Sequence, residues 1–130
     1  ERISAGEPGR LMHGPTFMAN PLATAVAGAL LDALDALDWP ERVRAIEAQL
    51  AAELEPCRAS PRVRDVRVLG AIGVVEMIDE LDLGAVVPRL VDLGVWLRPF
   101  GNLLYTMPPY VTTERELREI TAAMCEVTRG

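Results

Sequence analysis

The chain has 130 residues, of which half are apolar and a quarter are charged, and its net charge is −6. This length suits one domain that buries its own hydrophobic core. The acidic balance argues against a general nucleic-acid or membrane surface, because such surfaces need clustered positive charge. Charged residues interrupt the apolar runs well short of about 18 residues and no signal peptide is recognisable, so neither a membrane span nor a secretory leader is predicted.

The N-terminal third of the sequence predicts a loop followed by one long helix. Residues 1–19 contain glycine and proline without clear periodicity, which is typical of a loop. Asn20-Pro21 is typical of a helix start, because asparagine caps free backbone N–H groups and proline needs no N–H there. A helix is predicted over residues 21–38, and Trp39-Pro40 is expected to end it. We expect its first half, residues 22–31, to be buried on every side because it carries no charge.

The middle of the sequence predicts a helix, two strands and a short helix. Residues 41–55 keep apolar side chains at helical spacing, which predicts the second helix. The stretch VRDVRVLGAIGVVEMI is rich in Val and Ile and is interrupted by Gly70 and Gly73, which predicts a strand, a bend and a strand. The segment LDLGAVVPRLVDLG predicts a short helix that ends at Gly94.

The remaining residues predict two more strands and a last helix. VWLRPF and NLLYTM, at residues 95–100 and 102–107, should form short strands joined by a turn at residues 99–101. Thr113 should begin the last helix, because Glu116 follows it at the spacing of a capping box. This order of elements predicts an α+β fold in which helices cover a small antiparallel or mixed sheet.

The cysteines and acidic residues give weaker signals. Cys57 and Cys125 lie far apart and show no metal-ligand spacing, so reduced thiols of a cytosolic protein are predicted, with a disulfide between them as the alternative. The three aspartates between residues 32 and 38 drift around a helix, which predicts a solvated face rather than a metal site. Glu76 lies in an apolar strand, so a paired, partly buried carboxylate is expected there.

Two places carry candidate functional residues. Residues 14–16, Gly-Pro-Thr, offer a hydroxyl and backbone N–H groups just ahead of a helix, which is typical of an anion site such as one for phosphate; the alternative is that the threonine caps its own loop. His13 has no partner at motif spacing and is interpreted as structural. Arg98 stands between Trp96 and Pro99, a setting that suits bidentate capture of a carboxylate, with a surface salt bridge as the alternative.

Three stretches of the sequence carry a family resemblance: MHGPTFMANPLATAVA, VRVLGAIGVVEM and GVWLRPFGNLLYTMPPYVT. Together they resemble the C-terminal part of class III pyridoxal-phosphate aminotransferases over nearly the whole chain. The runs HGPTFM at residues 13–18 and RPFG at residues 98–101 are similar to the 7,8-diaminopelargonic acid synthase family in particular. Ala19 and Thr24 depart from the Gly and Cys of that family, but both changes replace one small residue with another.

The resemblance implies a division of the chain within a fold-type I transaminase. Residues 1–20 would be a loop of the large domain that carries the HGPT motif. Residues 21–38 would form the helix that links the two domains, and residues 39–130 would form the C-terminal small domain.

The resemblance also implies roles for particular residues in a homodimer. Gly14 and Thr16 would bind the phosphate of pyridoxal 5′-phosphate held in the partner subunit, and Gly14 would also lie against the substrate. Arg98 would bind the carboxylate of the keto substrate. The residues expected to border the site are Pro15, Phe17 and Tyr105.

The chain contains no lysine, since all 13 of its basic residues are arginine. These transaminases hold the cofactor through a lysine that lies upstream of HGPT, so the chain is predicted to be a C-terminal fragment that is inactive alone and has no catalytic residue of its own. The implied parent is a cytoplasmic homodimer that moves an amino group from S-adenosylmethionine to 8-amino-7-oxononanoate, giving 7,8-diaminononanoate in biotin biosynthesis. Two alternatives stay open: another class III ω-aminotransferase, or a non-catalytic α+β interaction module.

Overall fold

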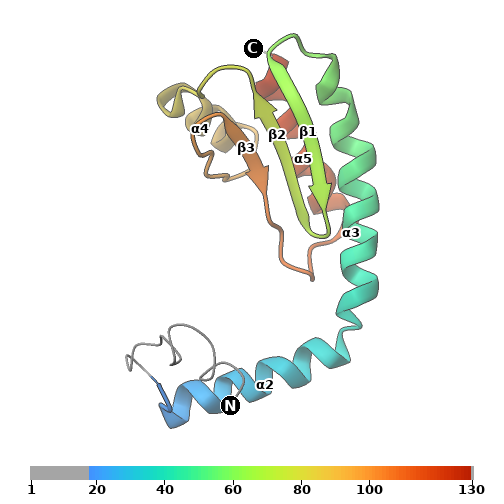
Figure 1. Ribbon diagram of the computed structural model, residues 1–130, viewed down its shortest axis with the longest axis vertical. Helices are drawn as coiled ribbons and strands as arrows, with labels where there is room; N and C mark the ends of the chain where they lie inside the picture. The colour runs from blue at the N-terminus through green and yellow to red at the C-terminus, as the bar shows by residue number, and fades with distance from the viewer. Residues whose placement is uncertain (1–17, 130) are drawn as a thin grey trace, which may run out of the picture. The chain divides into compact units, whose positions relative to one another are not determined.

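The computed structural model describes residues 18–129 and divides the chain into two units, Glu1–Leu37 and Asp38–Gly130 (Figure 1). In the first unit the described element is helix α2, Pro21–Ala36. The side chain of Asn20 accepts a hydrogen bond from the N–H of Ala23 at 3.0 Å, and proline occupies the start of the helix. The predicted helix start is confirmed, since a cap of this kind needs only residues that are adjacent in the sequence.

The expected burial of α2 is wrong for this chain. No residue of the helix is buried, and four large apolar side chains are between 58% and 74% exposed: Leu22, Val26, Leu30 and Leu31. A helix that is apolar on all sides normally lies inside a larger protein.

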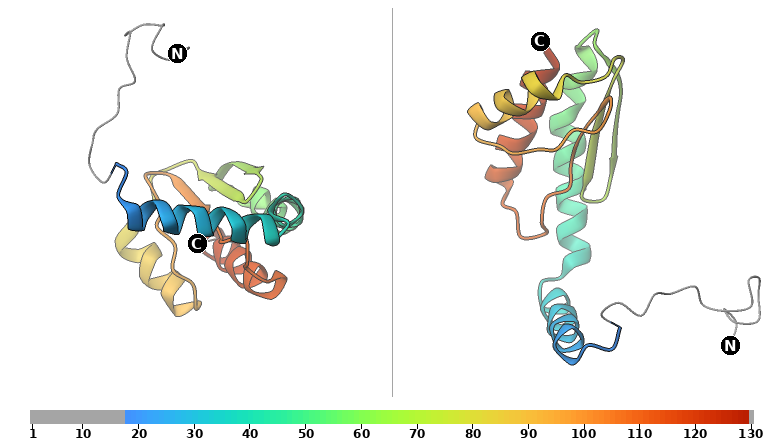
Figure 2. Two further views of the ribbon diagram at one scale, coloured as in Figure 1. Left: turned by 90° about the horizontal axis from the view of Figure 1, so that it is seen from below. Right: turned by 90° about the vertical axis from the view of Figure 1, so that its left-hand side faces the viewer.

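The second unit is a three-stranded antiparallel sheet, in the order β1-β2-β3, with helices behind it. Helices α3 and α5 pack together on the same side of the sheet, and α4 packs on α5 (Figure 2). The α+β class predicted from the sequence is confirmed. The elements are α3 (Trp39–Leu54), the 3-10 helix η1 (Glu55–Ala59), β1 (Val63–Leu69), β2 (Ile72–Met77), α4 (Leu83–Asp92), β3 (Leu103–Thr106) and α5 (Glu114–Arg129).

The hydrophobic core lies between the sheet and the helices. Leu50 and Leu54 of α3, Val75 of β2 and Met124 of α5 are fully buried within it. Gly73 of β2 allows α3 to approach the sheet closely, because a methyl group at this position would lie 2.8 Å from Cδ1 of Leu54. Helix α3 can therefore pack closely on the β1–β2 hairpin because Gly73 has no side chain.

The predicted bend between β1 and β2 is a two-residue turn. Leu69 pairs with Ile72, and Gly70 between them has a φ of +54°, which a glycine adopts without steric cost. Gly73 belongs to the strand that follows rather than to the bend. Buried and more exposed residues alternate along β2, and its buried residues Gly73, Val75 and Met77 face the helices.

Two predicted boundaries shift. Trp39-Pro40 begins α3 instead of ending α2, because Asp38, one residue before Trp39, adopts a left-handed φ of 50° and interrupts the helical backbone there. Helix α2 therefore ends at Ala36 and α3 begins at Trp39.

The start of α5 is confirmed: the N–H of Thr113 donates to Oε2 of Glu116 at 2.9 Å, and the N–H of Glu116 donates to Oγ1 of Thr113 at 3.3 Å. The backbone hydrogen bond from Thr113 lowers the pKa of Glu116 below its usual value.

One of the four predicted strands is wrong. Residues 95–99 form no strand, and only Phe100 pairs with Leu103, each donating its N–H to the other's carbonyl oxygen at 2.9 Å. Pro99 directly precedes this pair and has no N–H with which to extend the ladder. NLLYTM does contain a strand, β3, which pairs with β2. The sheet of the second unit therefore has three strands rather than four.

The prediction of two reduced cysteines is also wrong. Cys57 of η1 and Cys125 of α5 form a disulfide, with Cα atoms 5.3 Å apart. Helix α5 runs alongside α3 and packs against η1, which brings the two cysteines together although 68 positions separate them in the sequence. No local pattern signals such a long-range contact.

Candidate functional site

The predicted site residues fall into two groups. Gly14, Pro15, Thr16 and Phe17, together with His13, lie outside the described residues, so their roles stay predictions. Arg98 and Tyr105 lie in the second unit, in the connection from α4 to β3 and in β3 itself.

The segment around Arg98 is extended and held at both ends. At its start, Gly94 has a φ of +83° and the N–H of Val95 donates to the carbonyl oxygen of Leu90, which is fully buried in α4. At its end, Phe100 pairs with Leu103. Because both ends are anchored, the intervening residues have a fixed direction even though they belong to no sheet.

Side chains alternate along this segment between the core and the solvent. Val95 and Leu97 pack against the core and Pro99 is buried. Arg98 is exposed, and Trp96 and Phe100 on either side of it are 73% and 74% exposed. In an extended chain, residues two apart face the same side. Arg98 therefore projects from the molecule between two exposed aromatic residues.

The guanidinium of Arg98 makes no ion pair with any of residues 18–129. The surface salt bridge considered from the sequence is thus not formed within the described part of the chain. An exposed arginine flanked by aromatic rings suits a carboxylate attached to an apolar chain, since the fork binds the oxygens and the rings cover the hydrocarbon.

Phe100 is a further candidate that the sequence-based prediction did not include. Its signal was the period of two that relates Trp96, Arg98 and Phe100. Tyr105 of β3, which was predicted to border the site, pairs with Val74 of β2 and is half-buried. No hydrogen bond within the described residues joins it to Arg98.

Apart from Arg98, a cluster of charged side chains covers the outer face of the sheet. Glu76 of β2 pairs with Arg64 at 3.3 Å and with Arg67 at 2.5 Å, and Asp65 pairs with Arg67 and Arg58. The sequence prediction of a paired, partly buried Glu76 is confirmed. The hydrogen bond from Arg67 holds the pKa of Glu76 below its usual value of 4.5. These charged groups form ion pairs with one another, which is typical of a network that stabilises the fold.

Glu76→Gln is expected to reduce the stability of the second unit at pH 7 and to matter less in acid. The folded-state pKa of Glu76 is lowered, so the carboxylate stabilises the fold above its unfolded pKa of about 4.5, and this contribution is lost as the pH falls through the lower folded value. Urea midpoints measured at pH 7 and below pH 4 test this. Glu80→Gln, which changes an exposed carboxylate without an ion pair in residues 18–129, is the control. Equal midpoints for the Glu76 variant and the parent at pH 7 would contradict the expectation.

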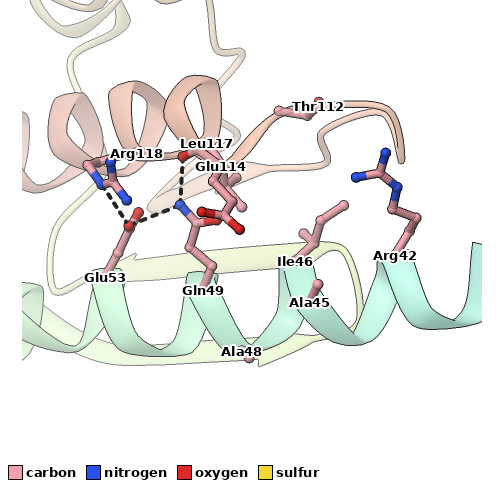
Figure 3. A pocket seen from close by; sticks show the side chains of 10 residues that line it. All are labelled: Arg42, Ala45, Ile46, Ala48, Gln49, Glu53, Thr112, Glu114, Leu117 and Arg118. Carbon is pink, nitrogen blue, oxygen red and sulfur yellow. Dashed lines mark hydrogen bonds and ion pairs between the residues drawn. The ribbon is translucent and has the colours of Figure 1, made fainter.

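A cleft of about 430 Å³ lies between α3 and the start of α5 (Figure 3). Three of the polar side chains that line it, Gln49, Glu53 and Arg118, have partners within the described residues. Gln49 donates to Glu53 at 3.0 Å and to the carbonyl oxygen of Glu114 at 2.8 Å, and Glu53 also pairs with Arg118 at 3.4 Å and accepts from Thr121 at 2.6 Å. None of the residues predicted from the sequence lines it. We interpret this cleft as a helix–helix junction whose hydrogen bonds fix α5 on α3.

Other site classes lack support in the part of the chain that the structure describes. Residues 18–129 contain no group of three His, Cys, Asp or Glu side chains placed to hold a metal ion. Asp32, Asp35 and Asp38 are exposed, as predicted for a solvated face. No helix within the same residues has the length and apolar character needed to cross a bilayer.

The chain belongs to the class-III aminotransferase family, whose model matches residues 1–127. It is 54% identical over 125 residues to the adenosylmethionine-8-amino-7-oxononanoate aminotransferase of Mycobacterium leprae, covering 96% of this chain and 29% of that protein. It is 40% identical to the enzyme of the same name from Saccharomyces cerevisiae, covering 92% of this chain and 26% of the relative. The chain thus spans less than a third of the length of these curated relatives.

Solved structures agree on the fold. The crystal structure of adenosylmethionine-8-amino-7-oxononanoate aminotransferase from Methanocaldococcus jannaschii superposes with a TM-score of 0.78 at 26% identity, over 96% of this chain and 31% of that one. Ornithine aminotransferase from Toxoplasma gondii superposes with a TM-score of 0.77 at 30% identity, over 90% of this chain and 29% of that one. The α+β unit is therefore a part of the transaminase fold that enzymes with different substrates share.

Proposed function

We propose that this chain is the C-terminal part of a pyridoxal-phosphate-dependent aminotransferase that moves an amino group from S-adenosylmethionine to 8-amino-7-oxononanoate. The observation that carries the proposal is the sequence identity of 40–54% to six proteins named for this reaction, each matched over 91% or more of the chain. The exposed Arg98 between Trp96 and Phe100 supports it, because the amino acceptor named by these relatives is an acid with an apolar chain.

Within this proposal the chain binds and orients, and residues outside it supply the covalent chemistry. Thr16 and Gly14 are proposed to donate to the cofactor's phosphate in the partner subunit of a cytoplasmic homodimer. Arg98 is proposed to hold the substrate carboxylate. Pyridoxal phosphate, when bound, supplies an electron sink for amino transfer. The chain has no lysine with which to attach it.

The test is an activity assay on the longer polypeptide that contains this chain. Purified protein is given S-adenosylmethionine and 8-amino-7-oxononanoate, and the diamino product is measured. Ornithine with a 2-oxo acid serves as the competing pair, since the ornithine enzyme shares the fold. Transfer with the first pair alone is expected. Transfer only with the second pair would assign the chain to another class III transaminase, and no transfer with either pair would favour an interaction module.

Thr16→Ala in that polypeptide is expected to weaken cofactor binding about tenfold or more. The change removes one hydroxyl donor to a dianionic phosphate, and hydrogen bonds to charged groups contribute roughly 1.5–3 kcal/mol. Titration of the cofactor by absorbance measures the affinity. Thr24→Ala is the matched control, because the Thr24 hydroxyl donates to the carbonyl oxygen of Asn20 within α2. Unchanged retention of the cofactor in the Thr16 variant would remove this residue from the site.

A further inference from the structure

The disulfide between Cys57 and Cys125 joins the short helix η1 to the C-terminal helix α5. Its Cα–Cα distance of 5.3 Å lies in the ordinary range for disulfides. Both residues belong to the core, with exposures of 2% and 7%. The bond closes a loop that contains the whole sheet and α4, because these elements lie between the two cysteines in the sequence.

The same site also accommodates the reduced form. Sγ of Cys125 lies 3.5 Å from the backbone carbonyl oxygen of Glu53, so a thiol there has an acceptor for its proton. Cys57 lies among buried apolar residues, where a free thiol packs as a small hydrophobic side chain. Further contacts hold the two elements together without the bond, since Oγ of Ser60 donates to the carbonyl oxygen of Thr128 at 2.7 Å. Breaking the disulfide therefore strands no charged group and does not separate α5 from η1.

We propose that Cys57 and Cys125 form a reversible redox clasp, and that its oxidation state sets the stability of the unit at residues 38–130. The oxidised form restricts the unfolded chain by closing a long loop, whereas the native packing changes little. The segment that leads to Arg98 lies beside the first half of α5, where Trp96 and Leu97 line a hollow together with Glu116 and Ile120, whereas Cys125 belongs to the second half of that helix. The effect of the clasp should therefore appear in stability rather than in the direction of that arginine.

The chemistry is thiol–disulfide exchange with a dithiol reductant. One thiolate of the reductant attacks a sulfur of the clasp, the S–S bond breaks, and the cysteine that leaves takes up a proton. The second thiol of the reductant then attacks the mixed disulfide, which leaves two cysteine thiols and a cyclic disulfide of the reductant. Two electrons and two protons pass to the protein. Since both sulfurs are buried, exchange must follow an opening of α5 from η1.

The test compares the full chain purified without reductant and after treatment with dithiothreitol. Thiols are counted with a chromogenic reagent in denaturant, and melting temperature and far-ultraviolet circular dichroism are recorded for each form. The oxidised form should show no free thiols and the reduced form two. Reduction should lower the melting temperature by roughly 10 to 30 °C and leave the spectrum at 25 °C unchanged. The rate of thiol release should rise with urea, as burial requires.

Matched variants separate the clasp from general effects of reductant. Cys57→Ser and Cys125→Ser should each melt close to the reduced parent and should not respond to dithiothreitol. If a variant fails to fold, the melting temperatures of the oxidised and reduced parent still test the proposal. Two free thiols in the untreated protein, or equal melting temperatures for the two forms, would overturn the proposal. Loss of the folded spectrum on reduction would also overturn it, since the bond would then be required rather than reversible. None of these readouts depends on transaminase activity, so they stand or fail independently of the proposed function.

Discussion

Leu50→Ala should lower the free energy of unfolding of the unit at residues 38–130 by roughly 2–5 kcal/mol, the range for large-to-small changes in a packed core. Leu50 is fully buried in the second half of α3. A methyl group on Gly73 would lie 3.3 Å from its Cδ2, so the side chain already closes against the backbone of β2. The surrounding residues cannot collapse far into the space left behind, because helix and strand are in direct contact there.

Urea unfolding followed by circular dichroism measures this loss, with an unchanged slope as the sign that the unfolding transition itself is the same. Leu69→Ala is the matched control, because it makes the same chemical change in the same unit on a side chain that is 76% exposed. Its effect should stay below about 1 kcal/mol. Similar losses for the two variants would mean that Leu50 is not the tightly packed residue that the structure shows.

The parts of the fold that were predicted from the sequence depend on neighbouring residues. Asn20 caps α2 through Ala23, and Thr113 and Glu116 cap α5 through each other. Each of these interactions spans three positions, so its signal is present in a short window. The same holds for the turn at Gly70, where one residue with positive φ joins two strands.

The parts that were wrong depend on partners far away in the chain or outside the described residues. Residues 95–100 were predicted to be a strand, but a strand needs a hydrogen-bonded neighbour, and only Phe100 has one. The pairing of Cys57 with Cys125 requires the packing of α5 on η1, which no local pattern encodes. The uncharged first half of α2 predicted a buried segment, and no residue of α2 is buried in the structure.

The candidate site shows the same division. Arg98 was chosen from the sequence because it stands between Trp96 and Pro99, and the alternation that places Phe100 on the same side of the chain was not used. Their solvent-facing position depends on Val95 and Leu97, which pack against the core, and on the buried Pro99. Residues 18–129 supply no ion-pair partner for Arg98, so the group that it binds stays a prediction.

Arg98→Ala in the longer polypeptide is expected to lower kcat/KM for 8-amino-7-oxononanoate by roughly tenfold to a hundredfold. In the proposed site this guanidinium meets a carboxylate at the end of an apolar chain, and its removal leaves a charge without a partner in a largely apolar setting. Arg98→Lys should give an intermediate value, because a single ammonium replaces a planar fork. Folding should be unaffected, since Arg98 is exposed and makes no ion pair with residues 18–129.

Single-turnover measurement of each half-reaction shows where the loss arises. The half-reaction with 8-amino-7-oxononanoate should lose most, and the half-reaction with S-adenosylmethionine should lose less, unless its carboxylate uses the same arginine. Arg42→Ala is the matched control: it removes another exposed arginine without an ion pair in the described residues, on α3 rather than beside Trp96 and Phe100. Equal rates for the Arg98 variant and the control in both half-reactions would make Arg98 a surface residue. The proposed substrate would then rest on sequence identity alone, without a side chain that recognises its carboxylate.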